Sequence, residues 1–386
     1  MDTEDQVYRE LQQHLDKSPV GYPATDSGVD VQLLKFLFTP EEAEIGQYLS
    51  NIQLEPVARI HKRVRKGGLK LSLGELREIL ERMVRKGTIL TYSDGLTEKR
   101  YKNSGVTAGG IVDFQVNRLT EELVDTFSKY HKEQFEQAET TGSIGIPQLR
   151  TIPVAQSIPV TEKHKVSTYD DVKYLVENAP GSLAVANCVC RQTKDIQGQS
   201  CSHSDIRETC LQIGSDHARQ YVEMGIGRYV TREEAYQILD RAEEAGFILQ
   251  PENSLHPEAI CCCCGDCCGL LSAVKKSARP VDLYASNYHA FVDTALCTGC
   301  GTCVSRCQLE ARVMEDGKAV VDLNRCIGCG NCVITCESGA SRLYQKEQQL
   351  VPPEDKDTMY MRILTRKKGR WHMFKLRLKM LLGMRV

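Results

Sequence analysis

No cysteine precedes Cys188 in this chain of 386 residues, and all 18 cysteines lie between Cys188 and Cys336. The chain also lacks an apolar run of about 18 residues, so we expect no membrane-spanning helix. Its N-terminus, MDTEDQVYRE, is acidic and lacks the apolar core of a signal peptide. These absences predict a cytoplasmic protein, in which clustered cysteines are metal ligands or redox groups rather than structural disulfides.

A strong net charge is also absent, since the formal charge is −2 at pH 7. No global field therefore attracts nucleic acid or a membrane, and such binding would need a local patch. The chain has no G-x-x-x-x-G-K-[ST] loop, no GxGxxG after a strand and no HExxH motif. Any catalysis would therefore take place at the second cysteine group, Cys188–Cys268.

Within residues 29–139, four helical patterns precede two short strand-like runs around Asp94-Gly95, a hairpin signal, and a longer helical stretch follows from Phe114 through Phe135. Helices followed by a hairpin resemble a winged helix-turn-helix domain. The candidate recognition helix, residues 73–86, mixes basic and acidic side chains, which suits a phosphate-facing surface poorly. We therefore expect this domain to dock or dimerise with protein, and we expect no nucleic-acid partner.

An internal repeat with a period of 29 residues stands out in the C-terminal third. Its two runs, CTGCGTCVSRC from Cys297 and CIGCGNCVITC from Cys326, both have the spacing C-x2-C-x2-C-x3-C. Three close cysteines in a glycine-containing loop hold three irons of one [4Fe–4S] cluster, and the fourth crosses to the other cluster. The predicted ligands are Cys297, Cys300, Cys303 and Cys336 for cluster 1, and Cys326, Cys329, Cys332 and Cys307 for cluster 2.

Residues 288–345 resemble a bacterial two-cluster ferredoxin module, with a hairpin expected around Asp316-Gly317 between the two runs. The resemblance implies two [4Fe–4S] clusters as cofactors. The chain departs from the family at one feature: Gln308 and Glu337 stand where proline usually follows the fourth cysteine.

A second group of ten cysteines lies upstream of the repeat. Adjacent cysteines on a regular strand point to opposite faces, so they cannot all serve one metal. The group is predicted to hold one or two further iron–sulfur clusters, with zinc or a redox disulfide as alternatives. Arg191 can offset charge there. The candidate ligands are Cys188, Cys190, Cys201, Cys210, Cys261, Cys262, Cys263, Cys264, Cys267 and Cys268.

The whole arrangement resembles a family of uncharacterised ferredoxin-like proteins of strict anaerobes, through its NCVCR segment, its CCCCGDCCG block and the two-cluster repeat. That resemblance implies electron transfer. The expected fold class is α+β. The expected segments are an arm (1–28), a winged-helix-like domain (29–139), a linker (140–160), a cysteine-rich α/β domain (161–287), the two-cluster ferredoxin domain (288–345) and a basic tail (346–386).

The tail has nine Lys and Arg residues and no acidic residue from Met361 to Val386. Trp371, Phe374, Leu378 and Leu381 recur at helical spacing, which is typical of a helix lying on an anionic membrane surface. A solvated tail and a partner-binding helix are the alternatives. The membrane interpretation would place the protein peripherally, at the inner face of the cell membrane.

Three functions compete. The first is an electron-transfer protein or subunit, with a flavoprotein or dehydrogenase as redox partner and no catalytic residue of its own. The second is an oxidoreductase with redox chemistry at the Cys188–Cys268 site. The third is a redox-sensing DNA-binding regulator, which the mixed charge of residues 73–86 disfavours.

Overall fold

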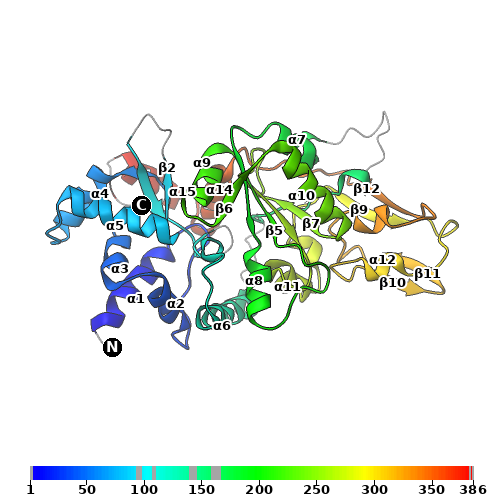
Figure 1. Ribbon diagram of the computed structural model, residues 1–386, viewed down its shortest axis with the longest axis horizontal. Helices are drawn as coiled ribbons and strands as arrows, with labels where there is room; N and C mark the ends of the chain where they lie inside the picture. Colours follow the sequence, from blue (N-terminus) through cyan, green and yellow to red (C-terminus); the bar gives the residue numbers. More distant parts are fainter. Residues whose placement is uncertain are drawn as a thin grey trace. The chain divides into compact units, whose positions relative to one another are not determined.

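The computed structural model describes residues 3–92, 98–106, 110–138, 146–157, 167–381 and 384 (Figure 1). The chain forms two compact units. The first comprises residues 1–140, 219–227 and 360–386, and the second comprises residues 141–218 and 228–359. Helices and strands are mixed in the chain, in agreement with the predicted class, and each unit is described by itself below.

The first unit is mainly helical and has one small antiparallel sheet, in the order β1-β3-β2. Its strands are β1 (Glu55–Pro56), β2 (Ile89–Tyr92) and β3 (Arg100–Asn103). Its helices are α1 (Thr3–Leu15), α2 (Val29–Leu37), α3 (Pro40–Gly46), α4 (Val57–Lys66), α5 (Leu73–Lys86), α6 (Glu121–Ala138) and α15 (Arg370–Leu381). The predicted strand pair is present as β2 and β3, while its turn at Asp94-Gly95 lies outside the described residues.

Two further helices, α9 (Ser215–Glu223) and α14 (Lys356–Lys368), run from the second unit into the first. Helix α5 begins at a capping box of the form Ser-x-x-Glu. Ser72 Oγ accepts a hydrogen bond from Glu75 N at 3.2 Å, and the Glu75 carboxylate accepts one from Ser72 N at 2.7 Å. These two bonds satisfy backbone donors that the first turn of a helix leaves unpaired.

The expectation of a loose arm at residues 1–28 is wrong for its first half. Thr3–Leu15 is a helix, and Tyr8, Leu11 and Leu15 are buried at spacings of three and four. This spacing places the three side chains on one face, which packs into the core of the unit. The prolines and glycines that suggested an arm follow the helix, so they did not describe the residues before them.

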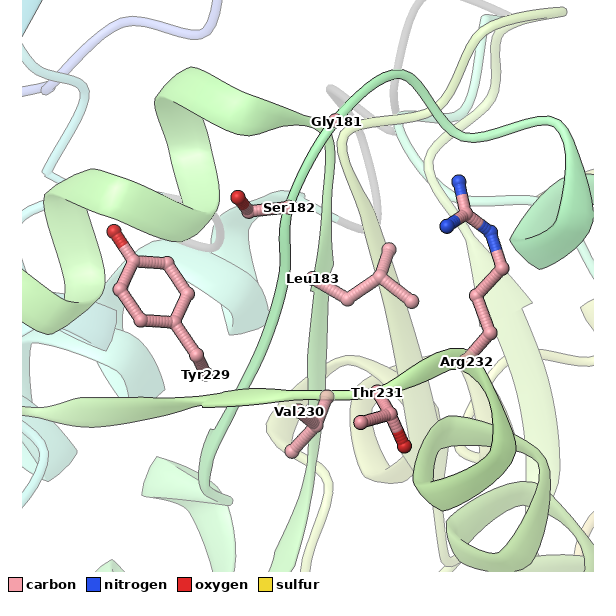
Figure 2. Close-up of a pocket in the computed structure, with 7 residues that line it drawn as sticks. All are labelled: Gly181, Ser182, Leu183, Tyr229, Val230, Thr231 and Arg232. Carbon is pink, nitrogen blue, oxygen red and sulfur yellow. The ribbon is translucent and has the colours of Figure 1, made fainter.

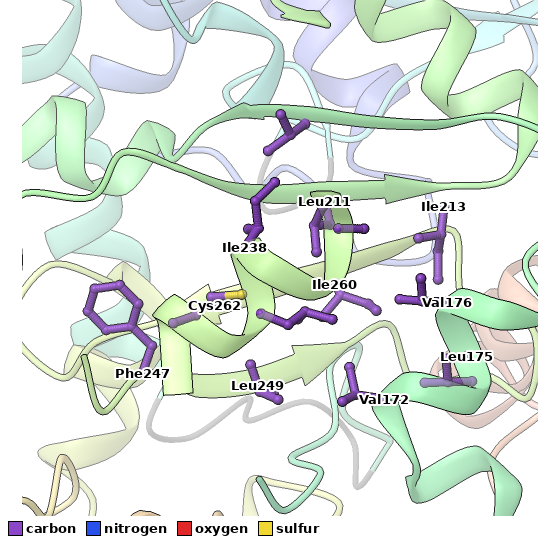
Figure 3. Close-up of a cluster of buried hydrophobic side chains, with 14 of the residues drawn as sticks. Val172, Leu175, Val176, Leu211, Ile213, Ile238, Phe247, Leu249, Ile260 and Cys262 are labelled. Atoms are coloured by element: carbon purple, nitrogen blue, oxygen red, sulfur yellow. The ribbon is translucent and has the colours of Figure 1, made fainter. Parts of the chain in front are cut away.

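The second unit is built on a five-stranded sheet in the order β6-β4-β5-β8-β7. Helix α10 packs against α7 and against β4, β5 and β7. The core beneath these helices is apolar, and Figure 3 shows its side chains, including Leu211, Ile238 and Cys262. The strands are β4 (Leu183–Asn187), β5 (Glu208–Ile213), β6 (Gly227–Val230), β7 (Ile248–Pro251) and β8 (Ala259–Cys263), and the helices are α7 (Val172–Glu177), α8 (Val189–Ile196), α10 (Arg232–Glu244) and α11 (Gly269–Lys275).

The segment with the cysteine repeat belongs to this same unit, although it was expected to be a separate domain. It contains two antiparallel strand pairs, and the β10–β11 turn has Asp316 and Gly317 at φ 48° and 73°, as the hairpin prediction requires. Its elements are β9 (Tyr288–Val292), β10 (Arg312–Glu315), β11 (Lys318–Val321), β12 (Ser341–Gln345), α12 (Thr302–Ser305) and α13 (Asn331–Ile334).

Part of the predicted linker at 140–160 is packed rather than free. Residues 146–157 are described, and within them Ile152 and Val154 are buried. Ile152 pairs with Leu249 of β7, so this segment extends the edge of the five-stranded sheet. Alternating apolar side chains in a proline-containing stretch therefore act as an edge strand here.

The C-terminal helix α15 has two contrasting faces. Met373 and Leu376 are buried and pack with Leu364 in a small apolar cluster of the first unit. The four residues of the predicted stripe instead face outward, with exposed fractions from 49% to 85%; they are Trp371, Phe374, Leu378 and Leu381. Among the described residues, no helix is both long enough and apolar enough to cross a membrane.

Candidate metal centres

The two ferredoxin-like runs fold back on one another so that the fourth cysteine of each lies with the other run. Cys336 shares an apolar cluster with Cys297 and Cys303. In the same way, Cys307 packs in a cluster with Cys326 and Cys332. This is the arrangement that two crossed [4Fe–4S] clusters require.

Backbone amides point at the sulfur atoms of both cysteine sets. Ala311 N donates to Cys307 Sγ at 3.2 Å, and Ser341 N donates to Cys336 Sγ at 3.3 Å. Such N–H···S bonds stabilise thiolate charge and raise the reduction potential of a cluster bound there. The loop geometry depends on glycine at Gly328, whose φ is +68° and where an added Cβ would lie 2.3 Å from the Tyr288 carbonyl oxygen.

Arg312 is a buried residue of β10 that the sequence did not single out. Its Nη2 donates to Cys332 Sγ at 2.9 Å and to Ser341 Oγ at 2.8 Å. Burial alone would lower the Arg312 pKa, but the neighbouring Cys332 and Cys303 sulfurs outweigh this and raise it. The guanidinium therefore stays charged, and it provides a fixed positive charge beside the cluster 2 cysteines.

Strand β8 divides the second cysteine group between the two faces of the sheet. Cys262 pairs with Leu249 and, with Cys264, joins the core under α7 and α10. Cys263 pairs with Ile248 and belongs to the apolar cluster on the other face, with Cys268 and the partly buried Cys261. The period of two along a strand thus separates cysteines that are adjacent in sequence.

On the face of Cys263 the structure assembles four thiols, which we call the four-thiol set: Cys188, Cys190, Cys263 and Cys268. Cys188 hydrogen bonds with Cys190. The thiols of Cys190 and Cys263 donate to Cys268 and lower the Cys268 pKa to about 5. Pairwise contacts link the four thiols, but among the described residues no three of their sulfur atoms gather within 4.8 Å of one another. This spread suits one thiolate for each iron of a [4Fe–4S] cluster.

Two predicted ligands lie beside this set and one lies away from it. Cys210 and Cys261 are paired across β5 and β8, and Cys261 also contacts Cys263. Cys262 is 98% buried among aliphatic side chains of the opposite face, where no sulfur hydrogen bond is present for it among the described residues. We therefore expect Cys262 to be a core residue and not a ligand.

A second constellation comprises Cys201, Cys264, Asp266 and Cys267, which we call the loop set. Its four ligand atoms all lie within 4.8 Å of one another. Asp266 was not predicted as a ligand, although it lies in the sequence between Cys264 and Cys267, which have C-x2-C spacing. The fourth member of the set is the predicted ligand Cys201, which lies in the loop between α8 and β5.

Arg191 lies between the two sets and is fully buried. Its Nη1 donates to Thr209 Oγ1 at 2.6 Å, its Nη2 donates to the Cys262 carbonyl at 2.9 Å, and its guanidinium stacks 3.9 Å from the Phe247 ring centroid. Burial would lower the Arg191 pKa, but the thiolates of both sets outweigh burial and raise it. Complete burial of the Arg191 side chain excludes a surface position for it.

Gln308 joins the ferredoxin-like segment to the loop set. Its Oε1 accepts from Gly265 N at 2.7 Å, and its Nε2 donates to the Gly246 carbonyl at 3.1 Å. An added Cβ at Gly265 would lie 2.4 Å from the Gln308 carbonyl oxygen, so only glycine permits this approach. The departure from proline at this position thus has a structural reason.

A pocket of about 370 Å³ lies at the start of β4 and the end of β6 (Figure 2). Its lining includes Tyr229, Thr231 and Arg232, and Arg232 Nη2 donates a hydrogen bond to the Ala179 carbonyl oxygen at 3.0 Å. No cysteine, histidine or carboxylate is among the described residues that line it.

Residues 289–337 match the family model described as 4Fe-4S dicluster domain. This segment contains all eight cysteines of the repeat. No curated protein and no solved structure matches the chain significantly. The C-terminal third of the chain thus carries an iron–sulfur dicluster domain of the ferredoxin type.

Proposed function

We propose that the chain is an iron–sulfur electron-transfer protein or electron-transfer subunit that relays electrons through three [4Fe–4S] clusters. Two are held by the repeat, with the crossed ligand sets given above, and the third by the four-thiol set. The observation that carries this proposal is one apolar cluster that contains Cys263, Cys268 and Cys329. A third centre would therefore adjoin cluster 2.

The burial of the cysteines supports cluster 1 as the point of electron exchange with partners. Cys300 of cluster 1 is exposed, whereas Cys326 and Cys332 of cluster 2 are buried. Cluster 1 is thus the site at which a redox partner such as a flavoprotein or dehydrogenase can approach. Electrons would pass from there to cluster 2 and then to the four-thiol set, or in reverse. Burial and hydrogen bonds would tune the potentials.

For the winged-helix-like segment we propose protein docking. Two cations of its candidate recognition helix α5 are paired with carboxylates: Arg82 pairs with Glu41 at 2.7 Å and with Glu42 at 2.9 Å, and Arg77 pairs with Glu98 at 3.4 Å. Cations already paired with carboxylates contribute little to phosphate binding. The regulator hypothesis is therefore the weaker alternative.

A stepwise reductive titration of the anaerobic full-length protein tests the proposal. With dithionite-reduced methyl viologen as donor, about three electrons per chain should be taken up reversibly, one for each cluster. About two electrons would remove the third centre from the proposal. Irreversible reduction, or none, would contradict electron transfer altogether.

A further inference from the structure

We propose that the loop set binds a single tetrahedral zinc ion, separate from the iron–sulfur clusters and independent of the electron-transfer proposal. The ligands are the thiolates of Cys201, Cys264 and Cys267 and the carboxylate of Asp266. The sequence alone left this region open between iron–sulfur, zinc and disulfide chemistry.

The spacing of the ligand atoms fits one ion. With metal–sulfur bonds of about 2.3 Å, tetrahedral geometry places ligand atoms roughly 3.8 Å apart. Cys201 Sγ lies 3.6 Å from Cys264 Sγ and 3.8 Å from Asp266 Oδ1. All four atoms lie within 4.8 Å of one another.

The ferredoxin-like cysteines provide an internal comparison. Each thiolate of a cubane binds a different iron, so its ligands stand farther apart than the ligands of one ion. Within the described ranges, the loop set is the one group of at least three Cys, His, Asp or Glu ligands gathered this closely. The eight cysteines of the repeat are all described and form no such group.

The carboxylate is held in the orientation that a ligand needs. Asp266 Oδ2 accepts from Ser202 N at 2.8 Å and from Ser202 Oγ at 3.0 Å. These bonds leave Oδ1 directed at the thiols. Hydrogen bonds of this kind orient a metal ligand and strengthen its binding. Three ionisable thiols and a carboxylate in one space repel as anions, and a divalent cation would remove that repulsion.

Zinc K-edge X-ray absorption and metal analysis of the anaerobic full-length protein test this proposal. We expect about one zinc per chain, with three sulfur ligands at about 2.3 Å and one oxygen ligand at about 2.0–2.2 Å. The zinc edge is insensitive to iron, so the result does not depend on how many clusters are loaded. A protein without zinc, or zinc surrounded by four sulfurs, would overturn the proposal.

Matched variants extend the test to the ligands. Cys267→Ser and Asp266→Asn should each reduce the zinc that survives dialysis against a chelator by about tenfold or more, with iron unchanged. Cys262→Ala is the control, because Cys262 belongs to the same cysteine block but is buried in the core; it should retain zinc. Loss of about four irons on Cys267→Ser, with no change in zinc, would instead assign the loop set to a cluster.

Discussion

Gln308 shows how one substitution in a repeat can connect two parts of a protein. It follows Cys307, a predicted ligand of cluster 2, and its side chain accepts from Gly265 in the loop between Cys264 and Cys267. A proline there would have no amide side chain. The same position in the second run, Glu337, is exposed and has no such contact in the described structure.

Proline substitutions at Gln308 and at Glu337 should therefore have unequal effects on stability. Gln308→Pro leaves the buried Gly265 N–H without its partner, at a cost of about 1–3 kcal/mol. Glu337→Pro should change stability little. Loss of cluster absorbance during thermal unfolding measures the difference, and equal midpoints for the two variants would show that the Gln308 contact is unimportant.

Arg312 allows a second prediction at the residue scale. Arg312→Gln removes a positive charge and the bond to Cys332 Sγ. The reduced cluster carries more negative charge than the oxidised one, so its potential should fall by on the order of tens of millivolts. An EPR-monitored redox titration measures this. Arg342→Gln, which removes an exposed arginine, is the control and should leave the potentials unchanged.

At the scale of elements, strand β8 decides which cysteines can reach a cluster. Its side chains alternate between the two faces, so Cys263 joins the four-thiol set and Cys262 enters the aliphatic core. Cys263→Ala should reduce iron from about twelve to about eight per chain, because one cluster loses a ligand. Cys262→Ala should keep all iron. Loss of iron in Cys262→Ala, with all iron retained in Cys263→Ala, would mean that the side chains of β8 point to the opposite faces of the sheet.

The parts predictable from the sequence were those specified locally. The repeat places its ligands within a few residues, and the family match covers it. The capping box of α5 and the turn at Asp316-Gly317 are equally local, and both are present. Alternation along a strand also indicated that CCCC serves more than one site.

Contacts between segments far apart in the chain could not be predicted from the sequence. Cys188 and Cys268 are eighty positions apart, and only the sheet brings their segments together. Nothing in the sequence distinguishes Asp266 and Arg312 from other charged residues, because only the fold places them beside cysteine sulfur atoms. Helix α1 was missed because the glycines and prolines after it masked its apolar spacing.

At the scale of the whole molecule, we propose that the exposed stripe of α15 lies on an anionic membrane surface. Trp371 and Leu381 are 70% and 85% exposed, with Lys375 and Lys379 on the same helix. We expect binding to vesicles that contain phosphatidylserine, weakened by salt. Trp371→Ala with Leu381→Ala should weaken partitioning about tenfold or more, because buried apolar area is lost.

Co-sedimentation of the full-length protein and its variants with vesicles measures this partitioning. Leu350→Ala is the control, because Leu350 is also exposed but lies outside any helix. Equal binding to purely zwitterionic vesicles, or no binding by the unaltered protein, would contradict the membrane proposal and favour a solvated or partner-binding helix.

The most direct test of the three-cluster relay is the amount of iron and acid-labile sulfide per chain in anaerobically purified protein, with EPR of the reduced form. Three [4Fe–4S] clusters predict about twelve of each and interacting signals, since cluster 2 adjoins the four-thiol set. About eight of each, with signals from the repeat alone, would mean that the four-thiol set holds no cluster and that the relay ends at cluster 2.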